Sequence, residues 1–258
     1  MTLAYKNSTI YYTDNGEGPA VVLLHGFLET SAMWTDFIPE LSKNNRVICI
    51  DLLGHGQTDC IGYVHTMDAM ADAVRSVLSE LNIVEAKVIG HSMGGYVALA
   101  LAEQQPALVA SLCLMNSTFE ADDDDRKALR ARANEIVKSN FENMVRMSFA
   151  NLFAAESKVK FKSAYESALA IALETPVQGY IAANEGMRLR PNRLEVFETV
   201  KGKQLLILGQ KDILISVRNL KSQTKDTKII LEELSEGHMS HIENKSELSY
   251  FLERFIEN

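Results

Sequence analysis

The sequence predicts one α/β domain in which a mostly parallel, twisted β-sheet is covered by helices. Short apolar segments rich in β-branched residues alternate with helical segments through about the first 120 residues. The same alternation resumes after about residue 190, and the region between contains helical stretches without a convincing strand. Alternating strands and helices are typical of βαβ units, whose parallel strands are buried on both faces. The length of 258 residues allows one such domain with an insertion.

The predicted strands are short apolar runs bounded by turn residues. They cover residues 8–13, 20–24, 47–50, 86–89, 111–115, 205–208 and 228–231. Helical periodicity predicts helices over residues 33–41, 67–81, 93–103 and 244–256. Asn244, with Glu247 three residues later, fits a capping box at the start of the last helix.

The middle of the chain is predicted to be a helical cap inserted between two strands of the same sheet. We place this cap at residues 121–190, and the core at residues 1–120 and 191–258. The acidic run 122–125 either opens the first cap helix, where carboxylates are favourable, or forms a solvated loop. Apolar residues of the cap could line a pocket or only pack on the sheet: Met144, Met147, Phe149, Leu152, Phe153 and Phe161.

Composition disfavours several classes of partner. A net charge of −8 and a sequence pI near 5.3 disfavour nucleic acid and anionic membranes. Cys49, Cys60 and Cys113 form no CxxC pair, so neither a zinc site nor a disulfide framework is expected. The chain starts without a basic, apolar leader, and no apolar run is long enough to span a bilayer. We therefore expect a cytoplasmic protein, either a monomer or a homodimer.

The strongest chemical signal is the G-x-S-x-G pattern that begins at Gly90. It follows a predicted strand and precedes a predicted helix, which is the context that a nucleophile elbow requires. Ser92 at the tip of such a turn holds strained backbone angles, and side chains two residues away would collide. Glycine at 90 and at 94 removes those Cβ atoms. The pattern therefore predicts Ser92 as a nucleophile.

A second signal is the segment His25-Gly26-Phe27, directly after the predicted strand 20–24. The tetrahedral intermediate of acyl transfer needs two converging N–H donors for its oxyanion. The backbone amides of Phe27 and Met93 are the candidates for this oxyanion hole. The His25 side chain is more typical of a structural loop histidine. We keep it as a candidate pocket residue.

Five segments together resemble the α/β-hydrolase superfamily over nearly the whole chain. They are His25-Gly26-Phe27, residues 51–56, residues 90–95, residues 205–212, and Gly237-His238 with Glu243. The chain is most similar to small serine esterases and related hydrolases that carry a helical cap. This resemblance implies an eight-stranded α/β-hydrolase sheet with the cap between its sixth and seventh strands.

The resemblance also implies a catalytic triad in the chain order serine, acid, histidine. Asp212, just past strand 205–208, is the expected acid, and His238, after the last strand, is the expected base. Glu120 and Asp122 are the alternative acids, and His241 is the alternative base.

Three other features near these motifs have structural explanations. In the family, the segment that holds Asp51 and His55 is a structural turn. Trp34 is either a candidate pocket residue with Gly26 or an ordinary core tryptophan. Arg188, Arg190 and Arg193 could bind a substrate carboxylate, but a solvated or salt-bridged face is the simpler interpretation.

These motifs favour a serine esterase. A serine at the elbow disfavours dehalogenases and epoxide hydrolases, which use aspartate there. We expect hydrolysis of a small or medium carboxylic ester through an acyl-enzyme, with no metal or organic cofactor. Carbon–carbon bond hydrolases, lyase-like relatives, cofactor-free perhydrolases and a slow hydrolase-fold receptor remain alternatives, because they could keep the same residues.

Overall fold

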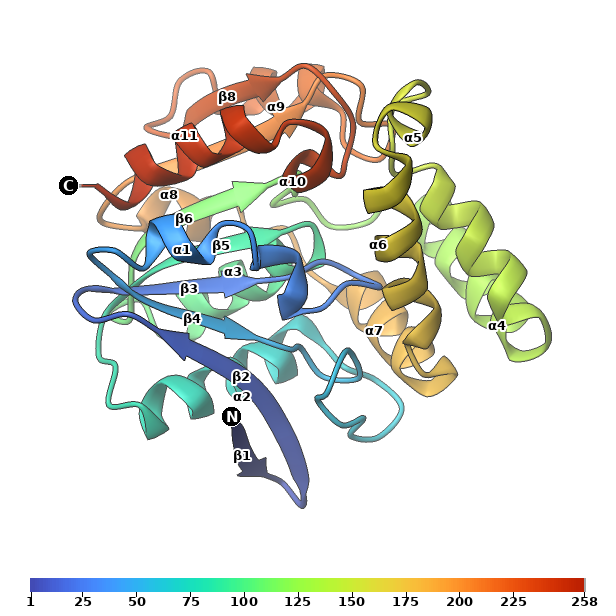
Figure 1. Cartoon of the computed structure of the whole chain (residues 1–258), viewed down its shortest axis with the longest axis horizontal. Helices are drawn as coiled ribbons and strands as arrows, with labels where there is room; N and C mark the ends of the chain where they lie inside the picture. The colour runs from blue at the N-terminus through green and yellow to red at the C-terminus, as the bar shows by residue number, and fades with distance from the viewer. Residues whose placement is uncertain (258) are drawn as a thin grey trace.

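The computed structural model describes residues 1–257, which form an eight-stranded sheet between layers of helices (Figure 1). The strand order is β1-β2-β4-β3-β5-β6-β7-β8. The pairings β1–β2 and β2–β4 are antiparallel, and the other five are parallel. The predicted mostly parallel, eight-stranded sheet is therefore confirmed. The strands are β1 (Thr2–Tyr5), β2 (Ser8–Asn15), β3 (Ala20–Leu24), β4 (Arg46–Ile50), β5 (Ala86–His91), β6 (Val109–Met115), β7 (Gln204–Gly209) and β8 (Ile230–Leu234).

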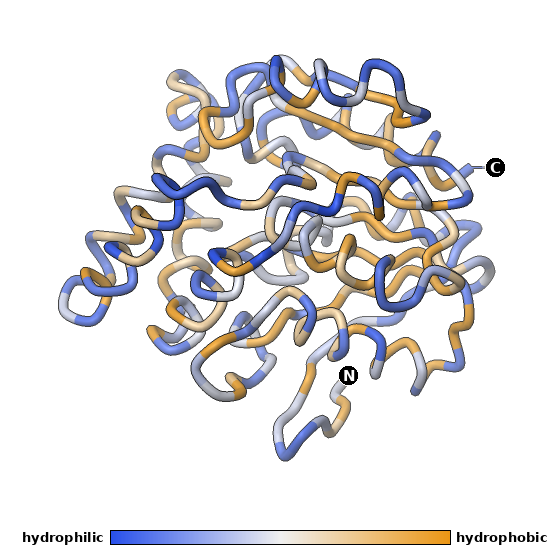
Figure 2. The backbone as a smooth tube through the Cα atoms, turned by 180° about the vertical axis from the view of Figure 1, so that it is seen from behind, coloured by the Kyte–Doolittle hydropathy of each residue, from blue (hydrophilic) through white to orange (hydrophobic). Residues whose placement is uncertain are grey.

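Helices cover both faces of the sheet because each presents an apolar stripe to it. On one face, Trp34, Phe37 and Leu252 join a buried apolar cluster with the strands. On the other face, side chains such as Val74 and Leu99 build a larger cluster. Figure 2 shows the hydrophobic strands at the centre and hydrophilic stretches along the outer helices. The helices outside the insertion are η1 (Ser31–Trp34), α1 (Ile38–Leu41), α2 (Met67–Glu80), α3 (Met93–Gln104), α8 (Leu194–Thr199), α9 (Val217–Thr224), α10 (Ser240–Glu243) and α11 (Lys245–Ile256).

Of the five helices between β6 and β7 in the chain, the first four are α4 (Asp124–Ala150), α5 (Ser157–Lys160), α6 (Lys162–Glu174) and α7 (Val177–Leu189). They gather beyond the carboxyl ends of the parallel strands (Figure 1). A third apolar cluster joins α4, α6 and α7 to Leu28 and Met239, which belong to loops of the sheet. Within residues 1–257, no helix combines the length and apolarity needed to cross a bilayer. The division into core and cap stays a prediction.

Asp123 caps α4, since its side chain accepts a hydrogen bond of 2.7 Å from the backbone N–H of Arg126. Of the two interpretations of the acidic run, the start of a helix is therefore the one that is found. The helix is bent at Asn140, whose backbone leaves the helical region.

Two expected helical features are wrong. Residues 33–41 form η1 and α1 rather than one helix, because Pro39 has no N–H to continue a helix across this stretch. Asn244 does not cap α11 through its side chain. Its Oδ1 accepts from the backbone N–H of Glu236 at 3.2 Å and its Nδ2 donates to Ser235 Oγ at 3.0 Å, so the amide ties the helix to the preceding loop instead.

Helix α7 packs so closely on the core that two of its positions admit only glycine. A Cβ at Gly179 would collide with the carbonyl oxygen of Gly54, and one at Gly186 with that of His65. The backbone N–H of His65 also donates to the carbonyl of Ala182 at 2.9 Å. These contacts fix α7, and with it one wall of the cavity described below.

This packing reverses the usual effect of replacing a helical glycine by alanine. Helix propensity alone would stabilise Gly186→Ala by about 1 kcal/mol. We expect instead a loss of about 1–3 kcal/mol in the free energy of unfolding, because the added methyl group meets backbone. Urea denaturation measures the change, with the exposed helical substitution Ser163→Ala as control. A stabilised Gly186→Ala variant would contradict the close packing of α7.

Candidate active site

Ser92 sits on a sharp turn between β5 and α3. Its backbone angles are φ 49° and ψ −115°, in a region that a residue with a side chain rarely adopts. A Cβ at Gly90 would collide with the carbonyl of Gly94, and a Cβ at Gly94 with the carbonyls at the end of β3. Both glycines are therefore needed for α3 to turn this tightly and to approach β3. The Ser92 backbone is held from β6 as well, since its N–H donates to the Met115 carbonyl at 2.9 Å.

His238 and Asp212 meet at the ends of the last two strands. The Nδ1 of His238 lies 2.6 Å from Oδ2 of Asp212. Oδ1 of the same carboxylate accepts from the backbone N–H of Leu214 at 2.8 Å. Burial by itself would raise the pKa of Asp212, but His238 and these hydrogen bonds outweigh burial and lower it. The Asp212 carboxylate is thus charged at neutral pH. Because it contacts Nδ1 of His238, Nε2 of the same ring stays available for another partner.

Asn116 was not predicted from the sequence, and it organises this corner of the site. It follows β6 directly and has a positive φ of 43°, which asparagine tolerates better than most residues. Its Nδ2 donates to Asp212 Oδ2 at 3.3 Å and to the Gly237 carbonyl at 3.1 Å. Its Oδ1 accepts from Ser240 Oγ at 2.6 Å. A polar residue at the carboxyl end of a buried parallel strand was the signal that could have revealed it.

Glu29, after β3, and His91, at the end of β5, form a second buried pair. One Glu29 oxygen, Oε2, accepts from the backbone N–H of Gly26 at 2.6 Å and lies 2.6 Å from Nδ1 of His91. The Nε2 of His91 lies 3.0 Å from the carbonyl oxygen of His238. Because a carboxylate and a carbonyl only accept hydrogen bonds, both ring nitrogens of His91 must donate. The geometry therefore indicates a buried ion pair between Glu29 and a protonated His91.

The pKa shifts agree with this ion pair. Burial by itself would raise the pKa of Glu29, but the charge of His91 and its hydrogen bond lower it to about 2. Burial would lower the pKa of His91, and Glu29 outweighs that effect and raises it. His241 is the third member of the cluster, with Nε2 3.8 Å from Glu29 Oε1. Burial lowers the pKa of His241 to about 4, so its ring is neutral at pH 7.

Glu29, His91 and His241 each offer a ligand atom, and these atoms lie within 4.8 Å of one another. Both nitrogens of His91 already take part in hydrogen bonds, so a metal ion there would have to displace one of these bonds. We therefore infer that this cluster positions the segments it connects: Gly26, the turn at Ser92 and the loop of His238.

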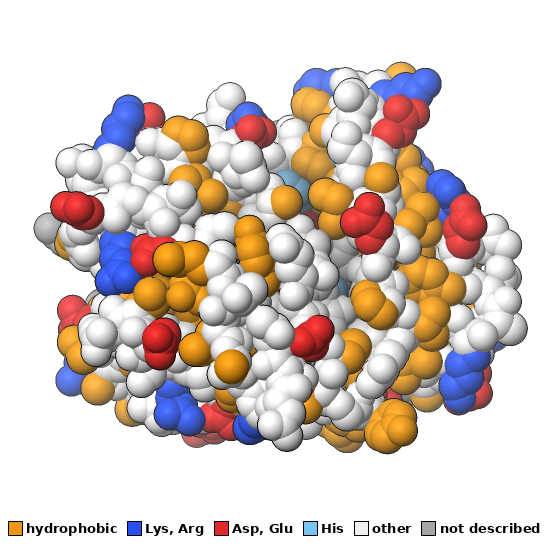
Figure 3. Space-filling model, turned by 60° about the horizontal axis from the view of Figure 1, so that its bottom comes forward, with side chains coloured by type: hydrophobic (Ala, Val, Ile, Leu, Met, Phe, Trp, Pro, Cys, Tyr) orange, Lys and Arg blue, Asp and Glu red, His pale blue; other side chains and the backbone are white. Residues whose placement is uncertain are grey.

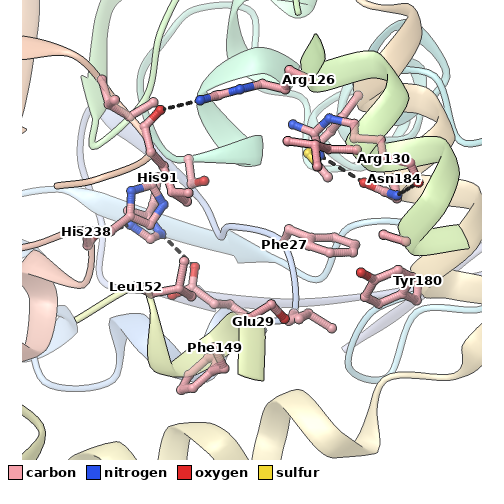
Figure 4. A pocket seen from close by; sticks show the side chains of 18 of the residues that line it. Phe27, Glu29, His91, Arg126, Arg130, Phe149, Leu152, Tyr180, Asn184 and His238 are labelled. Atoms are coloured by element: carbon pink, nitrogen blue, oxygen red, sulfur yellow. Dashed lines mark hydrogen bonds and ion pairs between the residues drawn. The ribbon is translucent and has the colours of Figure 1, made fainter. Parts of the chain in front are cut away.

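A cavity of about 360 Å³ opens above Ser92 and His238. In Figure 4, His91 and His238 lie on one side of it, and Phe27 and Tyr180 on the other. Figure 3 shows hydrophobic side chains gathered on the side of the inserted helices, with histidine visible only in narrow gaps. The lining is mostly apolar and includes Leu28, Leu129, Met144, Phe149, Leu152, Met187, Leu214, Ile215 and Met239.

The structure separates the predicted site residues into two groups. Ser92, His238 and Phe27 line the cavity, with Asp212 behind the histidine. Within residues 1–257, the backbone N–H groups of Phe27 and Met93 donate no hydrogen bond to a backbone carbonyl of another element, so both are available to a ligand. The three candidate pocket residues His25, Gly26 and Trp34 are buried and do not line this cavity.

Each of these three has a structural place. His25 Nε2 accepts from the backbone N–H of Leu52 at 2.8 Å, so its ring fixes a loop. Trp34 packs in the core against Phe37, on the face that η1 and α1 cover. Gly26 lies close to Ser92, because a Cβ there would come within 3.2 Å of Ser92 Cβ.

The rival acids have other partners. Glu120 Oε1 accepts from Asn219 at 2.8 Å and Gln223 at 2.7 Å. Asp122 forms ion pairs with Arg130 and Arg190. Asp212 is thus the carboxylate that binds His238 among residues 1–257.

The remaining candidates divide in a similar way. Arg188 and Arg193 pair with Glu185 and with Asp68 and Glu103, which fits the salt-bridged interpretation. Among the apolar candidates of the insertion, Met144, Phe149 and Leu152 line the cavity. Phe153 packs between inserted helices instead, and Met147 is exposed.

Comparisons with known proteins place the chain in a family that shares this fold. A family model described as alpha/beta hydrolase fold matches residues 19–245. A 3-oxoadipate enol-lactonase of Acinetobacter baylyi is 25% identical over 98% of this chain and 95% of its own. An esterase from Thermogutta terrifontis, solved with malate bound, has a TM-score of 0.91 and 26% identity over 99% of this chain and 96% of its own. An uncharacterized protein of Mycobacterium tuberculosis is 40% identical over 40% of this chain, and the match spans 30% of that relative.

The buried ion pair predicts how stability depends on pH. The pKa of Glu29 in the folded protein is about 2, below its ordinary value of 4.5. The ionised Glu29 carboxylate therefore stabilises the folded protein fully above about pH 4.5, and this stabilisation is lost as the pH falls toward 2. We expect Glu29→Gln to lower the free energy of unfolding by about 3 kcal/mol at pH 7, the cost of breaking a buried pair.

The difference in free energy of unfolding between wild type and Glu29→Gln should become smaller as the pH falls from 5 to 3. Urea denaturation at each pH measures it. The exposed substitution Glu198→Gln controls for the loss of one surface charge. A difference that is the same at pH 7 and pH 3 would rule out the ion pair.

Proposed function

Because the chain belongs to the alpha/beta hydrolase fold family, we propose that it is a serine hydrolase that cleaves carboxylic esters through an acyl-enzyme at Ser92. The observation that carries this proposal is the 2.6 Å contact between His238 and a charged Asp212, beside a strained serine that lines the same cavity. A serine hydroxyl is a weak nucleophile until a neighbouring base removes its proton.

In the proposed reaction, Nε2 of His238 takes the proton of Ser92 Oγ as the oxygen attacks the ester carbonyl. Asp212, on Nδ1, holds the productive tautomer and stabilises the imidazolium. The amides of Phe27 and Met93 donate to the oxyanion, and Met93 is the first residue of α3, where N–H groups point out of the helix. His238 then protonates the leaving alcohol, and water cleaves the acyl-enzyme by the same steps.

The inserted helices would act as a cap in this scheme. Side chains of α4 and α7 line the cavity with residues of the core, so substrate would bind between the two parts. A mostly apolar lining of about 360 Å³ favours a small or medium acyl group. The likeness to an esterase at 26% identity supports an ester substrate.

Lactones are a second candidate substrate class, favoured by the enol-lactonase relative that matches almost the whole chain. A lactone is a cyclic ester, so the same residues would open it. The leaving alcohol would then stay attached to the acyl group.

The nucleophile is tested with p-nitrophenyl esters of increasing acyl length and with aliphatic lactones. We expect turnover by the wild type and a loss on the order of 10⁶-fold in kcat for Ser92→Ala. Ser139→Ala, an exposed substitution on α4, serves as the matched control. Turnover that survives in Ser92→Ala would refute the acyl-enzyme mechanism, and no turnover of any ester or lactone would refute the proposed function.

The acid is tested separately. Asp212→Asn should lower kcat by about 10⁴-fold, because an amide favours the wrong tautomer of the histidine. Glu120→Gln removes the rival carboxylate and should leave kcat near the wild-type value. If Glu120→Gln caused the larger loss, the acid would have been assigned to the wrong residue. Circular dichroism checks that both variants are folded.

A further inference from the structure

The cavity carries two guanidinium groups from α4, those of Arg126 and Arg130. They lie one helical turn apart, so both side chains are on the same face of the helix. In Figure 4, Arg126 extends across the cavity toward the side of His91 and His238, and Arg130 lies beside Asn184. Most of the remaining lining is apolar, and its charged groups Glu29 and His91 pair with each other.

Arg130 belongs to a buried cluster with an excess of positive charge. It donates to Asp122 and, at 2.9 Å, to Asn184 Oδ1. The same Asp122 carboxylate also pairs with Arg190 at 2.8 Å. Two guanidinium groups therefore share one carboxylate. Arg190 in turn lies 4.0 Å over the ring of Tyr96, which lines the cavity.

Arg126 adds a second positive charge that no carboxylate balances. Its guanidinium donates to the Leu214 carbonyl at 2.9 Å, and it forms no ion pair with any carboxylate within residues 1–257. A guanidinium has five N–H donors, so most of them remain for a ligand. The acidic residues that begin α4, at positions 123–125, are exposed and do not line the cavity.

The carboxylate content of the cavity is low. Among the described residues, Glu29 is the acid that lines it, and its Oε2 is engaged by Gly26 and by the protonated His91. The α4 side of the cavity is thus positive in a chain whose net charge is −8. A carboxylate on the substrate would offer the Arg126 guanidinium a charged acceptor, which a neutral apolar ester lacks.

We propose that Arg126, supported by the Arg130 cluster, is a subsite for an anionic group of the substrate, so that the preferred ester carries a carboxylate. This inference rests on the proposed function and names its substrate class. Planar guanidinium groups bind carboxylates with two parallel hydrogen bonds, which gives both affinity and orientation. The carboxylate would be held at the α4 side while the ester lies at Ser92.

The proposal is tested with pairs of chromogenic esters that differ by one carboxylate. Mono(4-nitrophenyl) adipate is compared with 4-nitrophenyl hexanoate for a charge on the acyl side. For a charge on the alcohol side, 5-butyryloxy-2-nitrobenzoate is compared with 4-nitrophenyl butyrate. Adipate is used because monoesters of shorter diacids cyclise and release nitrophenol without enzyme.

We expect a higher kcat/KM for the carboxylate ester in at least one pair, and that pair identifies the charged side of the substrate. Arg126→Gln should lower this preference by roughly 10- to 100-fold, the range for a lost hydrogen bond to a charged group. Turnover of the neutral ester should be much less affected. Arg126→Lys should retain part of the preference, since the charge remains. Arg132→Gln, an exposed arginine on the same helix, should leave the preference unchanged.

Two results would overturn the subsite: neutral esters preferred in both pairs, or a preference for the carboxylate that Arg126→Gln does not change. Either result leaves the serine esterase intact as long as turnover depends on Ser92. Failure of the proposed function is distinguishable, because all four esters would then be inert.

Discussion

The strained turn at Ser92 is the constraint on which the rest of the site depends. A serine with φ 49° can follow β5 only if Gly90 and Gly94 lack side chains, and this lets α3 approach the end of β3. The segment after β3 is thereby placed beside the serine, with Gly26 against its Cβ. Strain of this kind persists only where the surroundings fix it, and here β6 and the Glu29–His91 pair do so.

Buried charged and amide side chains connect the parts of the site that come from distant stretches of the chain. Glu29 accepts a hydrogen bond from the backbone N–H of Gly26 and pairs with His91. His91 in turn donates to the carbonyl of His238. Asn116 likewise donates to Asp212 and to the Gly237 carbonyl. Because a buried charge or amide is costly when it loses a partner, each link resists displacement of its neighbours. The loops at the carboxyl ends of five strands are held in one arrangement by these contacts.

Much of this arrangement was predictable from the sequence, and the reasons are local. The apolar runs of β3, β5 and β7 are buried on both faces, so composition alone identifies them. The glycines two residues before and after Ser92 are required because side chains there would collide with backbone, so this spacing is visible in the sequence. By contrast, β1 is short and half exposed, so it carries no comparable signal. Glu29 and Arg126 could not be assigned because their roles arise from partners 62 and 88 residues away. The position of Asn116 after a buried strand was a signal, but its partner Asp212, 96 residues away, was not indicated by it.

Covalent labelling would show whether His238 and Asp212 activate Ser92, as proposed. An alkyl fluorophosphonate reacts with a serine only when the base removes its proton, so it needs no knowledge of the substrate. We expect one adduct on the native protein, located at Ser92 by peptide mass spectrometry, and much slower labelling of His238→Ala. Labelling at another serine, or an equal rate in His238→Ala, would contradict this mechanism.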